Sequence, residues 1–301
     1  MSVDPVPVDP VPVDPVPAGR RRWAWAEVDL DAITHNVHTL RAAVAPSEVW
    51  AVVKANGYGH GAVPVARAAL AAGASGLCVA LVEEGLELRS AGVESRVLVL
   101  SEQPPELLAE AVAGGLELTV YSTAQLAQIA AAGAHLHPVH LKIDTGMRRV
   151  GVRPSEALDL AEAIASSDAV QLAGVLTHLA VADDPDDPYT AGQLAQFNSI
   201  IVELGNAGHH PPAVHAANSA GGLAHHLSRL SMVRAGIAVY GISPGRGVDA
   251  YTSELRPAMS LVARVAHVKR VRTGERLSYG LRHQFAADTT VATLPLGYAD
   301  G

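Results

Sequence analysis

The sequence predicts an α/β fold, namely a (β/α)8 barrel of the TIM type followed by the start of a mainly β C-terminal domain. From about residue 50, short apolar runs rich in valine, isoleucine and leucine alternate with longer, alanine-rich segments. Eight such runs occur before residue 255, and eight is the number of strands in this barrel. After residue 255 apolar runs continue without helical segments between them, which indicates a β-rich region.

Short continuous apolar runs between turn signals are typical of strands that are buried on both faces. The segments between the runs predict helices, and several of them end at a glycine, as helices commonly do. Ser122 to Gln125 resembles a capping box that would open one of these helices. A doubly wound open sheet is the alternative architecture. The eight predicted strands lie near residues 50–54, 76–81, 96–100, 116–121, 139–143, 172–177, 213–218 and 232–240.

Composition divides the chain into three parts. Residues 3–17 repeat Val-Asp-Pro-Val-Pro three times, and such proline-rich repeats favour an extended, solvated chain. We therefore expect residues 1–22 to be a disordered tail. Residues 23–255 are predicted to form the barrel, and residues 256–301 an incomplete β-rich domain.

Charge and cysteine content exclude several classes of protein. The formal net charge of −8 argues against nucleic acid or an anionic membrane as the partner, and no apolar run is long enough to span a bilayer. Cys78 is the only cysteine, so no internal disulfide forms, which fits a reducing, cytoplasmic location. The acidic run Asp183–Asp187 contains a proline and is typical of a solvated loop, so we expect no metal site.

Polar groups follow the predicted strands at the ends where barrel enzymes place their active sites. Lys54 ends the first strand; it could be a lysine that has reached water, or a buried amine able to act as a nucleophile. Ser219 follows the seventh predicted strand, and Gly236-Ile237 lies within the eighth run. Barrels often bind phosphate in this region through backbone amides. An ordinary helix cap at Ser219 is the alternative.

Several ordered motifs resemble those of the alanine racemase family, from about residue 23 to the end of the chain. Each motif alone is weak, but their order and spacing make the resemblance specific. The matching stretches surround Lys54, Lys142 to Arg149, His178, Asn218-Ser219, Arg234 to Ile237, Leu277 to Gly280, and Gly297 to Gly301.

The resemblance implies a homodimeric enzyme that interconverts L-alanine and D-alanine with pyridoxal 5′-phosphate (PLP) and supplies D-alanine for peptidoglycan. Lys54 would carry the cofactor and act as one base, and Tyr279 of the partner subunit would act as the other. Arg149 would hold the substrate carboxylate, and Lys142 would be carbamylated beside it. The remaining cofactor-binding residues would be Tyr58, His178, Asn218, Ser219, Arg234, Gly236 and Ile237.

The resemblance also assigns finer roles. Arg234 would face the pyridine nitrogen of PLP, and because arginine stays charged it would leave that nitrogen unprotonated. His215 is either a support behind this site or a satisfied core histidine. Two other functions stay open, namely a different PLP-barrel enzyme and a PLP-binding carrier without turnover. Members of the family continue past the position of Gly301, so we expect weak dimerisation or lost activity if this chain is a fragment.

Overall fold

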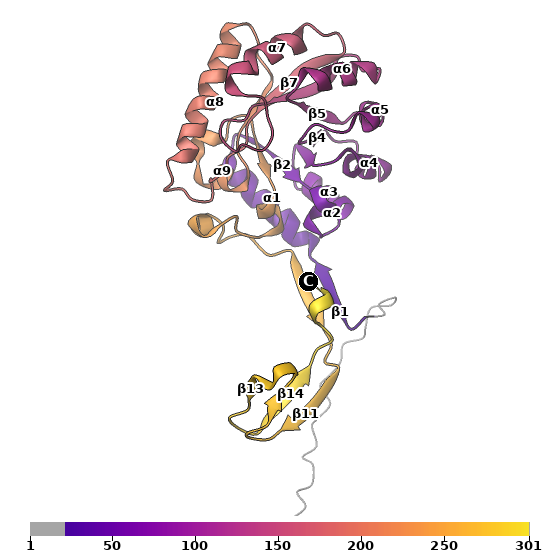
Figure 1. Ribbon diagram of the computed structural model, residues 1–301, viewed down its shortest axis with the longest axis vertical. Helices are drawn as coiled ribbons and strands as arrows, with labels where there is room; N and C mark the ends of the chain where they lie inside the picture. Colours follow the sequence, from indigo (N-terminus) through magenta and orange to yellow (C-terminus); the bar gives the residue numbers. More distant parts are fainter. Residues whose placement is uncertain (1–21, 301) are drawn as a thin grey trace, which may run out of the picture. The chain divides into compact units, whose positions relative to one another are not determined.

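The computed structural model describes residues 22–300, so nearly all of the predicted proline-rich tail lies outside the described residues (Figure 1). The described chain divides into two compact units. One unit runs from Val28 to Met259, and the other combines the residues before Val28 with those from Ser260 onward.

The larger unit is the predicted barrel. Its eight strands form one parallel sheet in the order β8-β7-β6-β5-β4-β3-β2-β9. All eight overlap predicted runs. The strands are β2 (Glu48–Val52), β3 (Gly76–Val79), β4 (Val97–Val99), β5 (Glu117–Val120), β6 (His137–Lys142), β7 (Val170–Leu176), β8 (Ala213–His215) and β9 (Met232–Ala235).

The two strands at the ends of this order lie side by side, so the ring is nearly closed. The amide of Ser231 donates to the carbonyl of Val214 at 3.0 Å, and the amide of Arg234 donates to that of Ala217 at 3.1 Å. An open doubly wound sheet has no such link between its outer strands, so the barrel prediction is confirmed and the alternative is wrong.

Helices surround the strands, and the first of them precedes the barrel strands in the sequence. Helix α1 begins after Asp29, whose side chain accepts hydrogen bonds from the amides of Asp31 and Ala32. It contacts β2, α3 and the 3-10 turn η4 (Ile237–Tyr240), and so packs beside β2 and the turn that follows β9. The helices are α1 (Leu30–Val44), α2 (Lys54–Tyr58), α3 (Ala62–Ala71), α4 (Val82–Ser90), α5 (Leu108–Ala113), α6 (Thr123–Ala131), α7 (Ala157–Ala165), α8 (Tyr189–Asn206) and α9 (Ser219–Ala224).

The predicted capping box before α6 is half right. The hydroxyl of Ser122 accepts from the amide of Gln125 at 3.2 Å, as an N-cap does. The Gln125 side chain does not return to Ser122; it exchanges hydrogen bonds with the backbone of Gln103 instead. The buried backbone of Gln103 is thus the partner of the Gln125 side chain, in place of the backbone of Ser122.

The smaller unit contains strands without an α-helix between them in its described residues. Strand β1 (Ala24–Val28) pairs with β10 (Met259–Ala263), and β11 (His267–Val271) runs antiparallel to β14 (Thr289–Thr293). The two-residue strands β12 (Arg276–Leu277) and β13 (His283–Gln284) form a further pair. In residues 22–300, no helix combines the length and the apolar character that crossing a membrane requires.

Candidate active site

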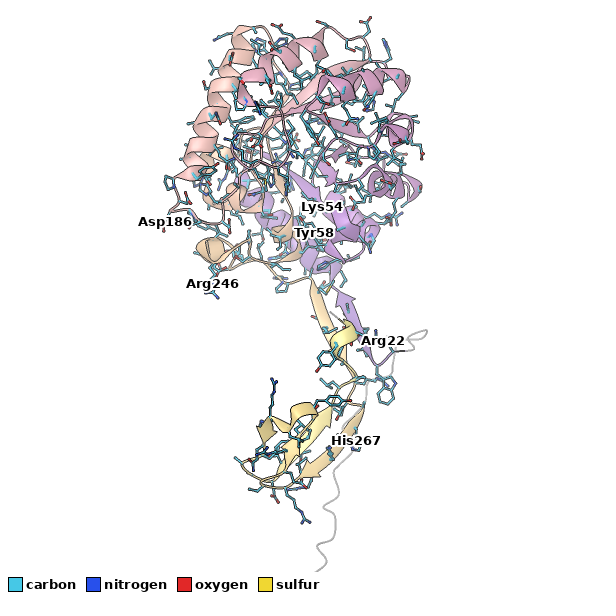
Figure 2. The ribbon with its side chains drawn as sticks, in the orientation of Figure 1. Arg22, Lys54, Tyr58, Asp186, Arg246 and His267 are labelled. Carbon is cyan, nitrogen blue, oxygen red and sulfur yellow. The ribbon has the colours of Figure 1, made fainter. Side chains whose placement is uncertain are left out.

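A cavity of about 620 Å³ opens among the segments that follow the carboxyl ends of the barrel strands. This is the end at which barrel enzymes place their active sites. Lys54 and Tyr58 lie close together at one end of the barrel unit (Figure 2). The cavity is lined by every barrel residue that the sequence predicted for the site: Lys54, Tyr58, Lys142, Arg149, His178, Asn218, Ser219, Arg234, Gly236 and Ile237.

Lys54 is presented to the cavity by an unusual turn. It opens α2, but the next three residues have positive φ angles of 52°, 52° and 61°, so the turn is left-handed. Left-handed backbone costs roughly 1–2 kcal/mol for each residue other than glycine. Two side-chain hydrogen bonds offset this cost: a Glu84 oxygen accepts from the amide of Ala55 at 2.6 Å, and Asn56 accepts from the amide of Ala62 at 2.9 Å. The side chain of Lys54 therefore extends into the cavity from a turn that hydrogen bonds hold in place.

Ser219 and Gly236 form another part of the cavity wall. The amide of Gly236 donates to the hydroxyl of Ser219 at 2.9 Å, so this amide already has a partner. A Cβ on Gly236 would lie 2.7 Å from the hydroxyl oxygen of Tyr58, so a side chain there would require Tyr58 to shift. Asn218, rather than Ser219, caps α9 by accepting from the amide of Gly221 at 2.9 Å.

Tyr58 is held in place from behind. Its ring packs against that of Tyr240 with centroids 4.8 Å apart, and the Tyr240 hydroxyl donates to the carbonyl of Val52 at 2.9 Å. Burial raises the pKa of Tyr58, so its hydroxyl stays protonated and can donate a hydrogen bond into the cavity.

Four cationic side chains line the cavity, namely Lys54, Lys142, Arg149 and Arg234, and Asp183 is the carboxylate among the lining residues. Lys142 shows the effect of this imbalance. Burial, and then the charges of Arg234 and Arg149, lower the pKa of Lys142 from 10.5 to about 8. The cavity therefore favours an anionic ligand with more than one negative group.

Arg234 is buried and held by several acceptors. Its Nη2 donates to the carbonyls of Thr177 at 2.8 Å and Ala216 at 3.0 Å, and reaches Nδ1 of His178 at 3.2 Å. Burial lowers the pKa of Arg234 to about 10, which still leaves it protonated at neutral pH. Burial and the charge of Arg234 lower the pKa of His178 well below its ordinary value, so His178 is neutral.

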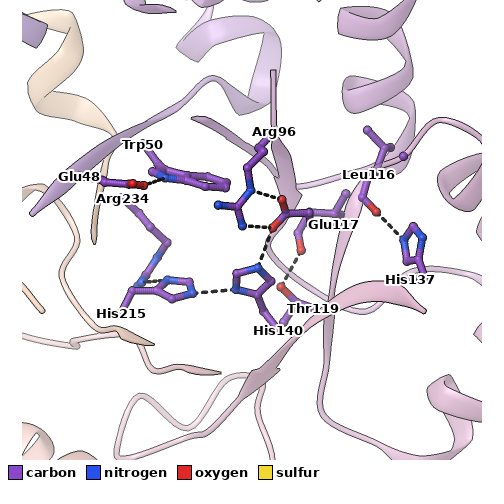
Figure 3. A network of polar contacts seen from close by, with 12 residues as sticks. Glu48, Trp50, Arg96, Leu116, Glu117, Thr119, His137, His140, His215 and Arg234 are labelled. Carbon is purple, nitrogen blue, oxygen red and sulfur yellow. Dashed lines mark hydrogen bonds and ion pairs between the residues drawn. The ribbon is translucent and has the colours of Figure 1, made fainter. Parts of the chain in front are cut away.

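Behind Arg234 lies a row of buried polar side chains, of which the sequence analysis named His215 but not His140 or Glu117 (Figure 3). His215 accepts from Arg234 at 2.8 Å and contacts His140 at 2.9 Å. His140 reaches Glu117 at 2.8 Å, and both Glu117 oxygens accept from Arg96. The available signal was a charged or polar residue inside an apolar strand, as Glu117 and His140 are.

Tyr279 is the predicted site residue that lies in the smaller unit. It begins the 3-10 turn η6 (Tyr279–Leu281), and its side chain is 92% exposed. The residues that line the cavity all belong to the unit Val28–Met259. In the part of the chain that the structure describes, no group of three or more His, Cys, Asp or Glu side chains could hold a metal ion.

The chain matches two protein families. The one described as "Alanine racemase, N-terminal domain" covers residues 28–244, and the one described as "Alanine racemase, C-terminal domain" covers residues 258–301. Among curated relatives, the alanine racemase of Symbiobacterium thermophilum is 44% identical over 283 residues, which cover 93% of this chain and 75% of that protein. The alanine racemase of Thermobifida fusca is 43% identical, with 93% and 76% covered. The chain thus spans about three quarters of the length of these relatives.

Solved structures agree with the sequence comparisons. Alanine racemase from D-cycloserine-producing Streptomyces lavendulae superposes with a TM-score of 0.86 at 39% identity, covering 94% of this chain and 76% of that one. Alanine racemase from Bacillus anthracis with bound L-Ala-P gives a TM-score of 0.84 at 37% identity, with 94% and 75% covered.

Proposed function

Because this chain belongs to the alanine racemase family of isomerases, we propose that it interconverts L-alanine and D-alanine with PLP held in the cavity of the barrel. The observation that carries the proposal is the cavity itself, in which Lys54 and three further cationic side chains surround about 620 Å³ of space. This volume is in the range of small-molecule sites. PLP carries a phosphate and the substrate a carboxylate, and the excess of positive charge suits both.

The wall formed by Tyr58, Ser219, Gly236 and Ile237 would hold the phosphate, supported by Asn218 at the start of α9. The Tyr58 hydroxyl and the Ile237 amide would donate to it. Gly236 would contribute space, because its own amide already donates to Ser219 and an added Cβ would meet Tyr58. Arg149 would bind the substrate carboxylate, since a guanidinium can donate two parallel hydrogen bonds to a carboxylate.

Arg234 would face the pyridine nitrogen of PLP as a permanent donor. With a pKa of about 10, Arg234 keeps its proton at neutral pH, so it would orient the ring without protonating it. When bound, PLP supplies an electron sink for the charge left at the α-carbon after a proton is removed. Without a protonated ring nitrogen this sink is weaker, which would favour return of the proton over side reactions.

Two bases on opposite sides of the α-carbon would exchange the configuration. Lys54 would remove or return the proton on one side. Tyr279 would act on the other side, in the cavity of a second copy of the chain, and its exposure of 92% supports a role outside its own unit. The free hydroxyl of a tyrosine has a pKa of about 10, so Tyr279 would need a cationic setting to act near neutral pH. Arg234 would supply the positive charge, and the neutral His178 would add a polar contact.

Lys142 would carry a carbamate. Its lowered pKa leaves a larger share of uncharged amine at neutral pH, and that amine can add to carbon dioxide with loss of one proton. The product is a carboxylate where a cation stood before, and it would orient Arg149. We place the enzyme in the cytoplasm, supplying D-alanine to peptidoglycan synthesis.

The test is turnover of the full chain with PLP and L-alanine, followed by a stereospecific assay for D-alanine. Formation of D-alanine that is lost in Lys54→Ala would support the proposal. A chromophore attached to Lys54 without D-alanine would support the cofactor site and remove the racemase activity for this chain. Absence of both would remove the proposal.

A further inference from the structure

We propose that Glu117 is a positioning residue for Arg234. It acts through a chain of hydrogen bonds in which Arg234 donates to His215, His215 donates to His140, and His140 donates to Glu117. The role rests on the function proposed above, because it concerns the guanidinium that would face the cofactor ring. The chain crosses the barrel interior from β9 through β8 and β6 to β5 (Figure 3).

The protons of this chain can be assigned from its two ends. A guanidinium can only donate, so Nδ1 of His215 must accept from Arg234. Neutral His215 then carries its proton on Nε2 and donates it to Nδ1 of His140 at 2.9 Å. His140 in turn carries its proton on Nε2 and donates to Glu117 at 2.8 Å. One arrangement of protons therefore satisfies every contact.

The charges of the end groups agree with this assignment. Burial raises the pKa of Glu117, but the hydrogen bonds from His140 and Arg96 outweigh it and bring the pKa to about 2. Glu117 is therefore a carboxylate and can only accept. Burial lowers the pKa of both imidazoles, and that of His215 lies well below its ordinary value, so both are neutral at neutral pH.

The outer end of the chain is anchored by Arg96. Its Nε and Nη2 donate to the two oxygens of Glu117 at 2.5 and 3.0 Å, and its guanidinium lies over the ring of Trp50 at 4.7 Å from the centroid. On the neighbouring strand β7, the residue paired with His140 is Gly174. A Cβ on Gly174 would overlap the His140 ring, so the glycine makes room for the imidazole inside the barrel.

Stability alone does not account for this row. Interiors of such barrels are usually filled with branched apolar side chains, and buried charges can often be replaced by apolar residues at no loss of stability. The row therefore orients the guanidinium of Arg234, because the protons of both imidazoles point away from it. The charge of Glu117 is balanced by Arg96, so the chain acts on Arg234 through hydrogen bonds, and no carboxylate stands beside its guanidinium.

The first test reads the protons directly in the full chain, before and after addition of PLP. Correlation spectra of 15N-labelled histidine rings should place one proton on Nε2 of His140 and of His215, and none on Nδ1. Glu117→Gln should give signals from both tautomers at these two residues. A charged imidazole or an Nδ1 proton in the unsubstituted chain would overturn the proposal, whether or not the chain racemises alanine.

The second test compares Glu117→Gln with Thr119→Val, a neighbour in β5 that loses one buried hydrogen bond of 2.6 Å outside the chain. Glu117→Gln should lower kcat by on the order of 10- to 100-fold with KM for L-alanine little changed, as expected when a group that orients the site is lost. Equal kcat in the two variants would overturn the proposal.

A second pair of variants decides the matter if Glu117→Gln does not fold. In His140→Gln the side-chain amide can still accept from His215 and donate to Glu117, whereas His140→Leu cannot do either. The proposal requires His140→Gln to retain at least about tenfold more turnover than His140→Leu. Equal turnover in this pair would contradict it.

Discussion

At Gly236 an added side chain would come into close contact with Tyr58. Gly236→Ala would put a methyl group 2.7 Å from the Tyr58 hydroxyl, so Tyr58 must move away from the proposed phosphate site. We expect the affinity for PLP to fall about tenfold, which corresponds to ~1.4 kcal/mol, while the fold is kept. Titration of PLP followed by absorbance measures this effect.

The matched control is Gly192→Ala in the exposed face of α8, where an added Cβ meets nothing within 4 Å. Alanine in a helix interior is favoured over glycine by roughly 1 kcal/mol, so this variant should be slightly more stable and bind PLP unchanged. Similar PLP affinities for the two variants would contradict the role given to Gly236.

Lys142 gives the chain a stability that depends on pH. The unfolded amine keeps its proton up to its ordinary pKa of 10.5, whereas the folded amine loses it above a pKa of about 8. Between these values the unfolded state binds more protons, so the free energy of unfolding should rise with pH across this window. Below it both states are protonated, and burial of the charge destabilises the fold by a constant amount.

Lys142→Met removes this group while keeping an apolar side chain of similar length. Urea unfolding of both proteins without PLP, in buffers free of carbon dioxide, gives the two pH profiles. The difference between them should shrink as the pH rises through the window and stay constant below it. Parallel profiles would show that the amine is not perturbed as the structure indicates.

Among the elements, strands were easier to predict than the turns that follow them. Each barrel strand is a continuous apolar run, and a strand buried on both faces leaves that signal in the sequence. The ends moved where the apolar run continues past the strand. β9 ends at Ala235 because the chain then turns into η4, although the predicted run extended to Tyr240.

The left-handed turn α2 could not have been predicted. Its handedness depends on Glu84 and on the amide of Ala62, which fix a backbone that its own residues disfavour. The Glu117 row was missed for the same physical reason. A polar residue inside a strand shows in the sequence, but the partner it meets across the barrel is decided only when the ring closes.

For the whole molecule, the sequence located the cavity because the barrel topology brings all the strand ends to one place. It could not establish how Tyr279 reaches a cavity, because that depends on the assembly of the chain and not on any element within it. We therefore still predict that the barrel binds the cofactor and that the β-rich domain supplies Tyr279 to the cavity of a partner chain.

Mixing two inactive variants tests this prediction. Lys54→Ala lacks the base on one side of the substrate and Tyr279→Phe the base on the other, so each alone should racemise alanine poorly while Tyr279→Phe still binds PLP. If each cavity takes Lys54 from one chain and Tyr279 from its partner, a mixed dimer has one complete cavity. Unfolding and refolding the two together should restore about a quarter of the unsubstituted activity, because half the dimers are mixed and half their cavities are complete. Refolding each variant alone is the control. Activity no higher than in these controls would place Tyr279 in the cavity of its own chain, or outside the reaction.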